Sequence, residues 1–429
     1  MTAPAAERAF DLVLLGASGF VGRLTADALA RLAPPGLRVA LAGRSRGRLE
    51  QVRAALPAGA SHWPLVVADS GDREALDALA GSTRVVVTTV GPYARLGLPL
   101  VEACAAAGTS YADLTGEVLF VRRSIERAHA RAASTGARIV HACGFDSVPS
   151  DLGLLLAAEK AREDGAGELT EASLLLVSAR GGLSGGTVDS MRTQADAART
   201  DAVARRLMRD PYALSPDRAA EADLGPQRDL AVRRDPLEDG RWVAPFLMAP
   251  FNTRIVRRSN ALRGWAYGRR LRYREGMSVG RSPAAPVLAG VTAVALAAAA
   301  TAMVLPPSRA ALDRVLPAPG QGPDERRRAA GHFVTRTTAL AADGSRYRTT
   351  LRAPGDPGYA ATSVLLAACA LSLALDELPP AAGVLTPATG IGAVLADRLR
   401  GAGVSLTVDR LPVDGSGRPA GTHGSGPAG

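Results

Sequence analysis

The feature that most constrains this chain is a strand, a glycine-rich loop, a helix and a second strand within its first 42 residues. Residues 10–15 form a short apolar run typical of a buried parallel strand, and residues 23–32 continue as a helical pattern. A Pro-Pro-Gly break follows, and residues 37–42 form the second strand. The loop before the helix consists of Gly16, Ala17, Ser18, Gly19, Phe20, Val21 and Gly22. This order, completed within about 30 residues, is that of a dinucleotide-binding unit.

Each glycine of this loop has a physical role in such a unit. Gly16 allows the tight turn, Gly19 lets the backbone approach a pyrophosphate, and Gly22 permits close packing of helix on strand. The helix start then offers free N–H groups and a partial positive charge to the phosphates. We therefore expect the whole loop 16–22 to bind the cofactor; the alternative is a structural turn without a ligand.

The end of the second strand indicates which dinucleotide binds. Sites that prefer NAD usually place Asp or Glu there, to accept a hydrogen bond from the ribose 2′-hydroxyl. This chain has Arg44 and Ser45 instead, which suit a 2′-phosphate. NADP(H) is the predicted cofactor, unless Arg44 is merely a solvated loop residue. Asp69, after the third strand, is expected to contact the adenine side or to cap the helix that begins near Asp72.

The alternation of strands and helices continues to residue 142. Strands are predicted at 62–69, 84–90, 110–114 and 138–142, with helices at 98–107 and 118–135 between them. Such alternation predicts an α/β fold, a Rossmann-type doubly wound parallel sheet. Val90 and Gly91 end a central strand, where loops face the ligand, and are predicted to contact the cofactor.

Three further segments contain candidate residues for the reaction site. Tyr93 follows the central strand, and its phenol is our candidate proton donor or polarising group; the alternative is a tyrosine packed beneath the cofactor. Ser147 fits the N-cap of a helix with Asp151 in its first turn, whereas the loop carrying Asp146 could instead close the site beside the nicotinamide. Asp113 and Glu117 could line the same cleft or cap helices, and capping is the favoured role of Glu117.

The chain divides into four parts by pattern. Residues 1–150 are the NADP-binding domain, and residues 151–355 are a substrate-binding α+β domain. The latter contains a predicted strand at 171–180, a helix at 187–208 and a hairpin at 332–351, with an irregular surface segment at 210–240. Residues 356–405 are expected to form helices that return to the first domain. Residues 413–429 form a Gly/Pro/Ser tail that we expect to be disordered.

A basic–apolar junction, residues 254–305, is the unusual feature of the second domain. The chain carries a formal net charge of +10, and nine arginines and one acid between positions 254 and 281 give +8 of it. A generic nucleic-acid-binding protein is therefore a poor fit, and no nucleic-acid partner is expected. Residues 287–305 follow as an uncharged run of 19 residues. A core helix is favoured for them, with a membrane-surface helix and a membrane span as alternatives. The arginines form a solvated face, a contact with anionic lipid or a dock for an acidic carrier protein.

Four motifs in this order resemble the saccharopine dehydrogenase-like oxidoreductases, and most closely their bacterial trans-acting enoyl reductase branch. The motifs are residues 16–22, Val90-Gly91-Pro92-Tyr93, residues 111–117 (YADLTGE) and residues 143–151 (CGFDSVPSD). Later segments at 184–187, 320–323 and 355–359 extend the resemblance over nearly all of residues 8–405. It implies an NADP-linked Rossmann fold with an inserted second domain. It also implies reduction of an enoyl double bond on a polyketide or fatty-acyl chain from a partner synthase, in lipid and glycolipid biosynthesis.

The leading hypothesis is hydride transfer from NADPH to the β-carbon of an activated alkene, with protonation of the α-carbon. One rival is a saccharopine-type amino-acid dehydrogenase, and another is a non-catalytic NADP-binding protein associated with membranes or lipid. The five histidines show no zinc-protease spacing, so no metal is expected. Three scattered cysteines and the lack of a secretory signal pattern lead us to expect a cytoplasmic protein, with the inner face of the plasma membrane as a contact.

Overall fold

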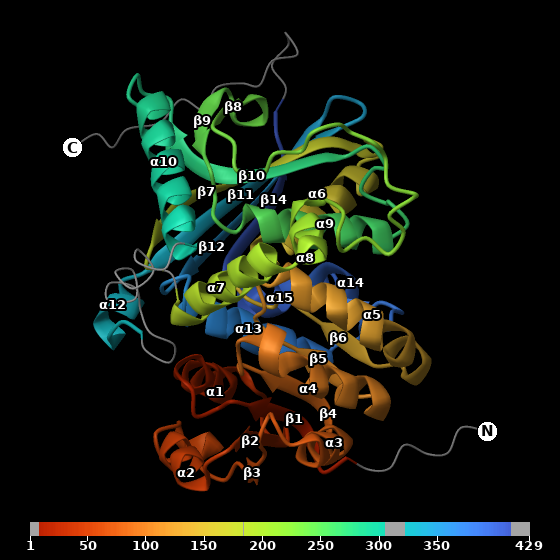
Figure 1. The fold of residues 1–429 in the computed structure, drawn as a ribbon, viewed down its shortest axis with the longest axis vertical. Coiled ribbons are helices and arrows are strands. Elements are labelled where there is room, and N and C mark those ends of the chain that lie inside the picture. The colour runs from red at the N-terminus through yellow and green to blue at the C-terminus, as the bar shows by residue number, and fades with distance from the viewer. Residues whose placement is uncertain (1–7, 183, 305–321, 413–429) are drawn as a thin grey trace.

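A computed structural model describes residues 8–182, 184–304 and 322–412 and shows two seven-stranded sheets (Figure 1). The first sheet has the order β13-β6-β5-β4-β1-β2-β3, and all of its pairings are parallel. Its strands are β1 (Phe10–Leu15), β2 (Val39–Gly43), β3 (Leu65–Val67), β4 (Thr83–Thr88), β5 (Ser110–Ala112), β6 (Arg138–Val140) and β13 (Gly383–Leu385). The predicted Rossmann-type fold is confirmed.

Helices cover both faces of this sheet because its apolar strands are buried on both sides. On one face α3 (Arg73–Ser82), α4 (Tyr93–Ala107) and α5 (Val118–Thr135) pack side by side. On the other, α1 (Phe20–Leu32) packs against α13 (Ala360–Leu375), which is almost wholly buried. Two short helices, α14 (Pro387–Gly390) and α15 (Val394–Gly401), follow α13. Helix α13 also packs on β1, β4 and β5 of the first sheet.

The second sheet, in the order β14-β12-β11-β7-β10-β9-β8, is mixed. Its centre is β7 (Leu169–Arg180), which pairs parallel with β10 (Arg272–Gly280) and antiparallel with β11 (His332–Ala341). The predicted hairpin is β11 with β12 (Arg346–Pro354). The remaining strands are β8 (Arg233–Asp235), β9 (Arg241–Ala244) and β14 (Ser405–Arg410). Because β14 joins this sheet while β13 joins the first, the C-terminal segment ties the two sheets together.

The helices of the second half connect and flank this sheet. They are α6 (Val148–Glu163), which packs on β11 and β12, α7 (Gly185–Thr200), α8 (Ala202–Arg209), α9 (Ala249–Leu262), α10 (Ala285–Val304) and the short α12 (Glu325–Ala329). The helix predicted at 187–208 is interrupted at Asp201, whose side chain accepts a hydrogen bond from the Val203 amide and so caps α8. The predicted tail 413–429 lies outside the described residues.

The arginine cluster is distributed differently from the predicted solvated face. In α9, Arg254, Arg257 and Arg258 are all less than 10% exposed. Arg258 donates to the backbone carbonyls of Leu214 and Val384, both at 2.6 Å. The segment 210–240, predicted to lie on the surface, therefore contributes buried residues. Within the described chain, three more arginines of the cluster form ion pairs: Arg263 with Glu159, Arg274 with Glu171, and Arg281 with Asp239.

The prediction that residues 287–305 form a core helix is wrong. Helix α10 exists, but only 6% of its most apolar 18-residue window is buried, and its mean hydropathy there is 1.8. Figure 1 shows it standing along the edge of the second sheet. Val287, Val291 and Val294 are each at least 60% exposed. By length and composition, it is the one helix among the described residues that meets the requirement for crossing a membrane.

Candidate functional site

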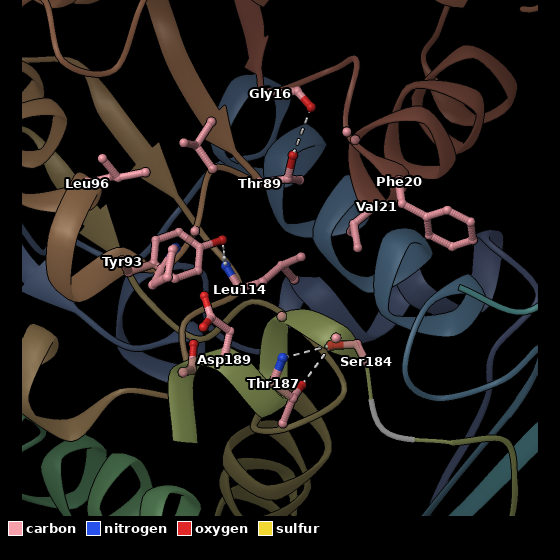
Figure 2. Close-up of a pocket in the computed structure, with 18 of the residues that line it drawn as sticks. Gly16, Phe20, Val21, Thr89, Tyr93, Leu96, Leu114, Ser184, Thr187 and Asp189 are labelled. Carbon is pink, nitrogen blue, oxygen red and sulfur yellow. Dashed lines mark hydrogen bonds between the residues drawn. The ribbon is translucent and has the colours of Figure 1, made fainter. Parts of the chain in front are cut away.

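A cavity of about 580 Å³ lies at the carboxyl ends of the first sheet's strands (Figure 2). Ligands of open parallel sheets bind at this edge, where the strand order reverses. Its walls come from four parts of the chain, which are the strand ends of the first sheet, residues 184–194, Met248 and residues 357–362. Segments from both halves of the chain therefore form one site. The strand ends of the first sheet line one side of the cavity, and the later segments cover it.

The loop 16–22 forms the part of the cavity suited to a pyrophosphate. Gly16 adopts φ +87°, a left-handed conformation that favours glycine, and a Cβ on Gly22 would lie 2.0 Å from the Gly16 carbonyl oxygen. Helix α1 begins with no side-chain cap at Gly19 and no acid in its first turn, so its first N–H groups are free for an anion. All predicted loop residues line the cavity except Ala17, which is fully buried in the core.

The adenosine end is lined by Arg44 and by Asp69, as predicted, and also by Arg48. Ser45 does not line the cavity but precedes α2 (Arg46–Ala54) as its N-cap. The Asp69 carboxylate accepts a hydrogen bond from the Gly71 amide at 2.9 Å, while Asp72 caps α3. Sequence reasoning missed Arg48, although its place one helical turn after Arg44 was a usable signal. Two guanidinium groups beside a strand end without an acid suit a 2′-phosphate.

Arg44→Asp is expected to weaken NADPH binding about 100-fold and NADH binding far less, since it puts a carboxylate where the 2′-phosphate needs a cation. Fluorescence titration with both cofactors measures the change. The matched control is Arg46→Asp, because Arg46 is exposed, pairs with Glu50 and does not line the cavity. An unchanged ratio of the two affinities in Arg44→Asp would contradict the assignment.

Tyr93 lines the cavity at the end expected to hold the nicotinamide, beside Val90 and Gly91. Its hydroxyl donates to the Thr88 carbonyl and accepts from the Leu114 amide, each at 3.2 Å, as the dashed line in Figure 2 shows for Leu114. The ring is buried and stacks on Phe120, and burial raises the pKa of the phenol well above its usual value. These contacts fit the alternative of a tyrosine packed beneath the cofactor; its role as a proton donor stays a prediction.

Glu117 and Asp113 stabilise the loops beside the cavity by accepting hydrogen bonds from them. Glu117 does cap a helix, but not its own: its carboxylate accepts from the Tyr93 and Ala94 amides at 3.1 and 2.8 Å and so caps α4. Asp113 is fully buried and accepts from Tyr111 and His141 side chains and from two backbone amides. Neither carboxylate lines the cavity.

Asp146 does line the cavity, at the end of β6. Leu114, Gly116 and Met248 line the same part of the wall, together with Thr362 of α13. Burial raises the pKa of the Asp146 carboxyl from its usual value to about 6. Ser147 is the N-cap of α6 as predicted, but its hydroxyl donates to Asn252 rather than accepting from the helix.

The cover of the cavity was largely missed by sequence reasoning. Ser184 caps α7, accepting from the Thr187 amide, and the Tyr359 hydroxyl accepts from the Gly185 amide at 3.1 Å (Figure 2 shows the Ser184 cap). Asp189 pairs with Arg95 at 3.3 Å, and so links α7 to α4. No local pattern in residues 357–362 indicated that they would line the same cavity as the start of α7.

Charge divides the cavity into two ends. The described cationic side chains that line it are Arg44 and Arg48, both at the adenosine end. The opposite end presents apolar side chains, glycines and uncharged polar side chains, with two acids, Asp146 and Asp189, of which Asp189 is paired with Arg95 outside the lining. A ligand with carboxylates to be recognised has no described cation there, whereas an uncharged acyl group meets no charge it must displace.

Comparison with known proteins gives a consistent picture. A family model described as the saccharopine dehydrogenase NADP-binding domain matches residues 12–140. A Mycobacterium tuberculosis protein named a putative trans-acting enoyl reductase is 53% identical over 416 residues, which are 95% of this chain and 99% of the relative. A Mycobacterium bovis protein named a trans-acting enoyl reductase is 50% identical over 420 residues, again 95% and 99% of the two chains.

Among solved structures, apo saccharopine dehydrogenase (L-Glu forming) from Saccharomyces cerevisiae is similar over 94% of this chain and 100% of its own. The TM-score is 0.50 at 14% sequence identity. This likeness concerns the fold, which agrees with the two-sheet architecture described above.

Proposed function

The chain belongs to the saccharopine dehydrogenase-like family and, within it, to the trans-acting enoyl reductases, and we propose that it reduces the enoyl double bond of a polyketide or fatty-acyl chain. It is an NADP-dependent oxidoreductase that acts on a C=C bond. The finer proposal is that a partner synthase presents the acyl chain on an acidic carrier protein, and that the product enters lipid or glycolipid biosynthesis.

The residues present fit NADP(H). Gly16 and Gly22 allow the tight loop that leads into α1, the uncapped start of α1 offers its N–H groups to the pyrophosphate, and Arg44 and Arg48 suit the 2′-phosphate. When bound, NADPH supplies the hydride. The protein's own part is to orient the two reactants, keep water from the reacting carbons and supply a proton.

The observation that carries this function is the absence of described cations from the substrate end of the cavity. Saccharopine is an amino acid with several carboxylates, so a site for it would need arginines or lysines there. Leu114, Met248 and Gly116 instead suit an apolar chain. This argues for the acyl substrate over the amino-acid dehydrogenase alternative.

The proposed function is tested by following NADPH absorbance with purified protein and 2-enoyl thioesters, either on N-acetylcysteamine or on an acyl carrier protein. We expect oxidation of NADPH with the enoyl thioesters and none with saccharopine. Oxidation only with the amino-acid substrate would overturn the proposal, and tight NADPH binding without turnover would favour a non-catalytic protein. A higher rate with the carrier-bound substrate would support delivery in trans.

A membrane contact through α10 is part of the same proposal, with the protein in the cytoplasm at the inner face of the plasma membrane. The helix is uncharged and apolar around its whole circumference, which is the composition of a helix surrounded by an apolar phase. It contacts α7, whose first residues line the cavity. A lipid-bound acyl chain held at α10 would therefore lie beside the catalytic cavity.

The double variant Val291→Asp with Val294→Asp is expected to reduce vesicle binding at least about tenfold, because two carboxylates would have to enter an apolar phase. Flotation with vesicles of phosphatidylcholine and phosphatidylglycerol measures binding. Val203→Asp on α8 is the control, since Val203 is 64% exposed but lies on a charged helix. Lack of wild-type binding, or equal binding of both variants, would contradict the membrane contact.

A further inference from the structure

We propose that Asp146 is the proton donor that completes the reduction, delivering a proton to the α-carbon of the acyl chain. This inference rests on the proposed function, since it assigns a residue to that reaction. It is distinct from the prediction for Tyr93, whose hydroxyl is already held between two backbone groups.

The position of Asp146 in the sheet is the first argument. In this strand order a dinucleotide extends from β2 and β3, past the glycine loop after β1, to the end of β4. Asp146 follows β6, two strands beyond β4, and lines the same cavity. A group there lies past the nicotinamide end and next to the space left for substrate. Its Oδ2 stands 3.9 Å from the position that a Cβ on Gly116 would take.

The second argument is that the Asp146 carboxyl, among the described residues, has no hydrogen-bond or ion-pair partner. Every other carboxylate around the site is engaged. Asp113 accepts four hydrogen bonds, Glu117 accepts from two amides and from Ser190, Asp189 pairs with Arg95, and Asp69 binds the Gly71 amide. A polar group directed into a cavity without a partner there is available to the ligand.

The backbone on both sides of Asp146 is fixed, as a catalytic group requires. The Phe145 amide donates to the Thr362 hydroxyl at 2.8 Å, which ties the loop to α13. The Ser147 hydroxyl donates to Asn252 at 2.9 Å, which ties it to α9. The backbone at Gly144 packs closely on its neighbours, because a Cβ there would lie 2.8 Å from the Leu114 Cδ2 and 3.2 Å from the Thr362 Oγ1. The carboxyl is therefore held in place without being neutralised.

The surroundings of Asp146 favour its protonated form. The elements packed around it present Leu114, Gly116, Met248 and Thr362, none of them charged. The nearest titratable groups are bound elsewhere: Asp151 of α6 by Ser259 and the Ala388 amide, and Asp113, Glu117 and Asp189 as described above. The pKa of about 6 caused by burial agrees with this arrangement, and a bound apolar chain would exclude more water and raise it further.

The hydride forms a C–H bond at the β-carbon, and the alkene electron pair moves to the α-carbon and thioester oxygen as an enolate. The Asp146 O–H bond breaks, and its proton forms the C–H bond at the α-carbon. The acyl chain is reduced by two electrons, NADPH is oxidised to NADP⁺, and solvent returns the proton to the carboxylate after product leaves.

Asp146→Asn tests the assignment, because the amide keeps the shape and cannot release a proton. We expect kcat to fall about 100-fold with KM and NADPH affinity within threefold of wild type. Wild-type kcat should decrease about tenfold per pH unit above the donor's pKa, and this dependence should disappear in the variant. Asp146→Glu should recover part of the rate. Asp77→Asn, an exposed carboxylate on α3, is the control expected to match wild type.

A measurement that does not depend on turnover completes the test. Carbon-13 NMR of Asp-labelled protein, recorded without cofactor, should show two carboxyls titrating near pH 6, those of Asp146 and Asp151, and only the signal of Asp146 should be missing in Asp146→Asn. Wild-type kcat and pH dependence in Asp146→Asn would overturn the donor role while leaving the proposed function intact. A wild-type protein that consumes no NADPH with any enoyl thioester would overturn both.

Discussion

Gly22→Ala is expected to weaken NADPH binding by at least about 100-fold, or roughly 3 kcal/mol. The added Cβ would lie 2.0 Å from the Gly16 carbonyl oxygen, 2.8 Å from its carbonyl carbon and 2.9 Å from the Ala17 Cα. All three are backbone atoms, so no side chain can move aside and the loop itself must shift away from α1. That shift moves the amides that would face the pyrophosphate, and it is expected to cost about 1–3 kcal/mol of stability as well.

Isothermal titration with NADPH and thermal unfolding of the same samples separate the two effects. Gly81→Ala is the matched control, because Gly81 lies in α3 with nothing within 4 Å of its added Cβ. That substitution should leave binding unchanged and stabilise the protein by about 0.5–1 kcal/mol, as alanine does in a helix. Wild-type affinity in Gly22→Ala would mean that the loop does not carry the pyrophosphate.

Asp113→Ala is expected to lower the free energy of unfolding by about 4 kcal/mol or more, since it leaves several buried donors without an acceptor. The lost partners are the Tyr111 hydroxyl at 2.9 Å, the His141 Nδ1 at 2.7 Å, and the Thr115 and Ala142 amides at 3.0 and 3.1 Å. These hydrogen bonds connect the segments that follow β5 and β6. Without them, the backbone near Tyr93 and Asp146 would be less firmly held.

Denaturant unfolding followed by circular dichroism measures this loss. Asp113→Asn should lose roughly half as much, because the amide keeps one acceptor oxygen but presents an NH₂ group to a donor. Asp77→Ala, which breaks an exposed pair with Arg73, should change stability by less than about 0.5 kcal/mol. A stable but inactive Asp113→Ala protein would instead give Asp113 a direct part in the reaction.

Local patterns were enough to predict the first sheet. Strands such as β1 and β4 are short, apolar and bounded by turns, and their burial on both faces makes the pattern continuous. The glycine loop could be predicted for a similar reason. The close contact that requires glycine at position 22 is with Gly16 and Ala17, which lie in the same seven-residue loop. The residue range 111–117 was recognised as functional, but the roles of Asp113 and Glu117 depend on partners far along the chain.

The basic–apolar junction shows where local patterns fail. Nine arginines in one stretch indicate a charged surface, yet Arg258 lies in the interior because two backbone carbonyls from distant segments meet it there. Residues 287–305 have the composition of a core helix, yet α10 is exposed because nothing in the described chain packs over its outer side. Whether a residue is buried depends on the segments that pack against it, and local composition does not specify which segments these are.

The sequence by itself determined the parallel sheet, the glycine loop, the NADP-type strand end and the family, since each depends on residues close together in the chain. Tertiary structure alone decided that residues 184–194 and 357–362 cover the cavity, that Glu117 caps α4, and that Asp146 has no partner among the described residues. Those facts depend on contacts between segments separated by tens to hundreds of residues. The periodicity of apolar residues indicates which face of a helix or strand is buried. It does not indicate which group from another segment a side chain will contact, because that depends on how the whole chain packs.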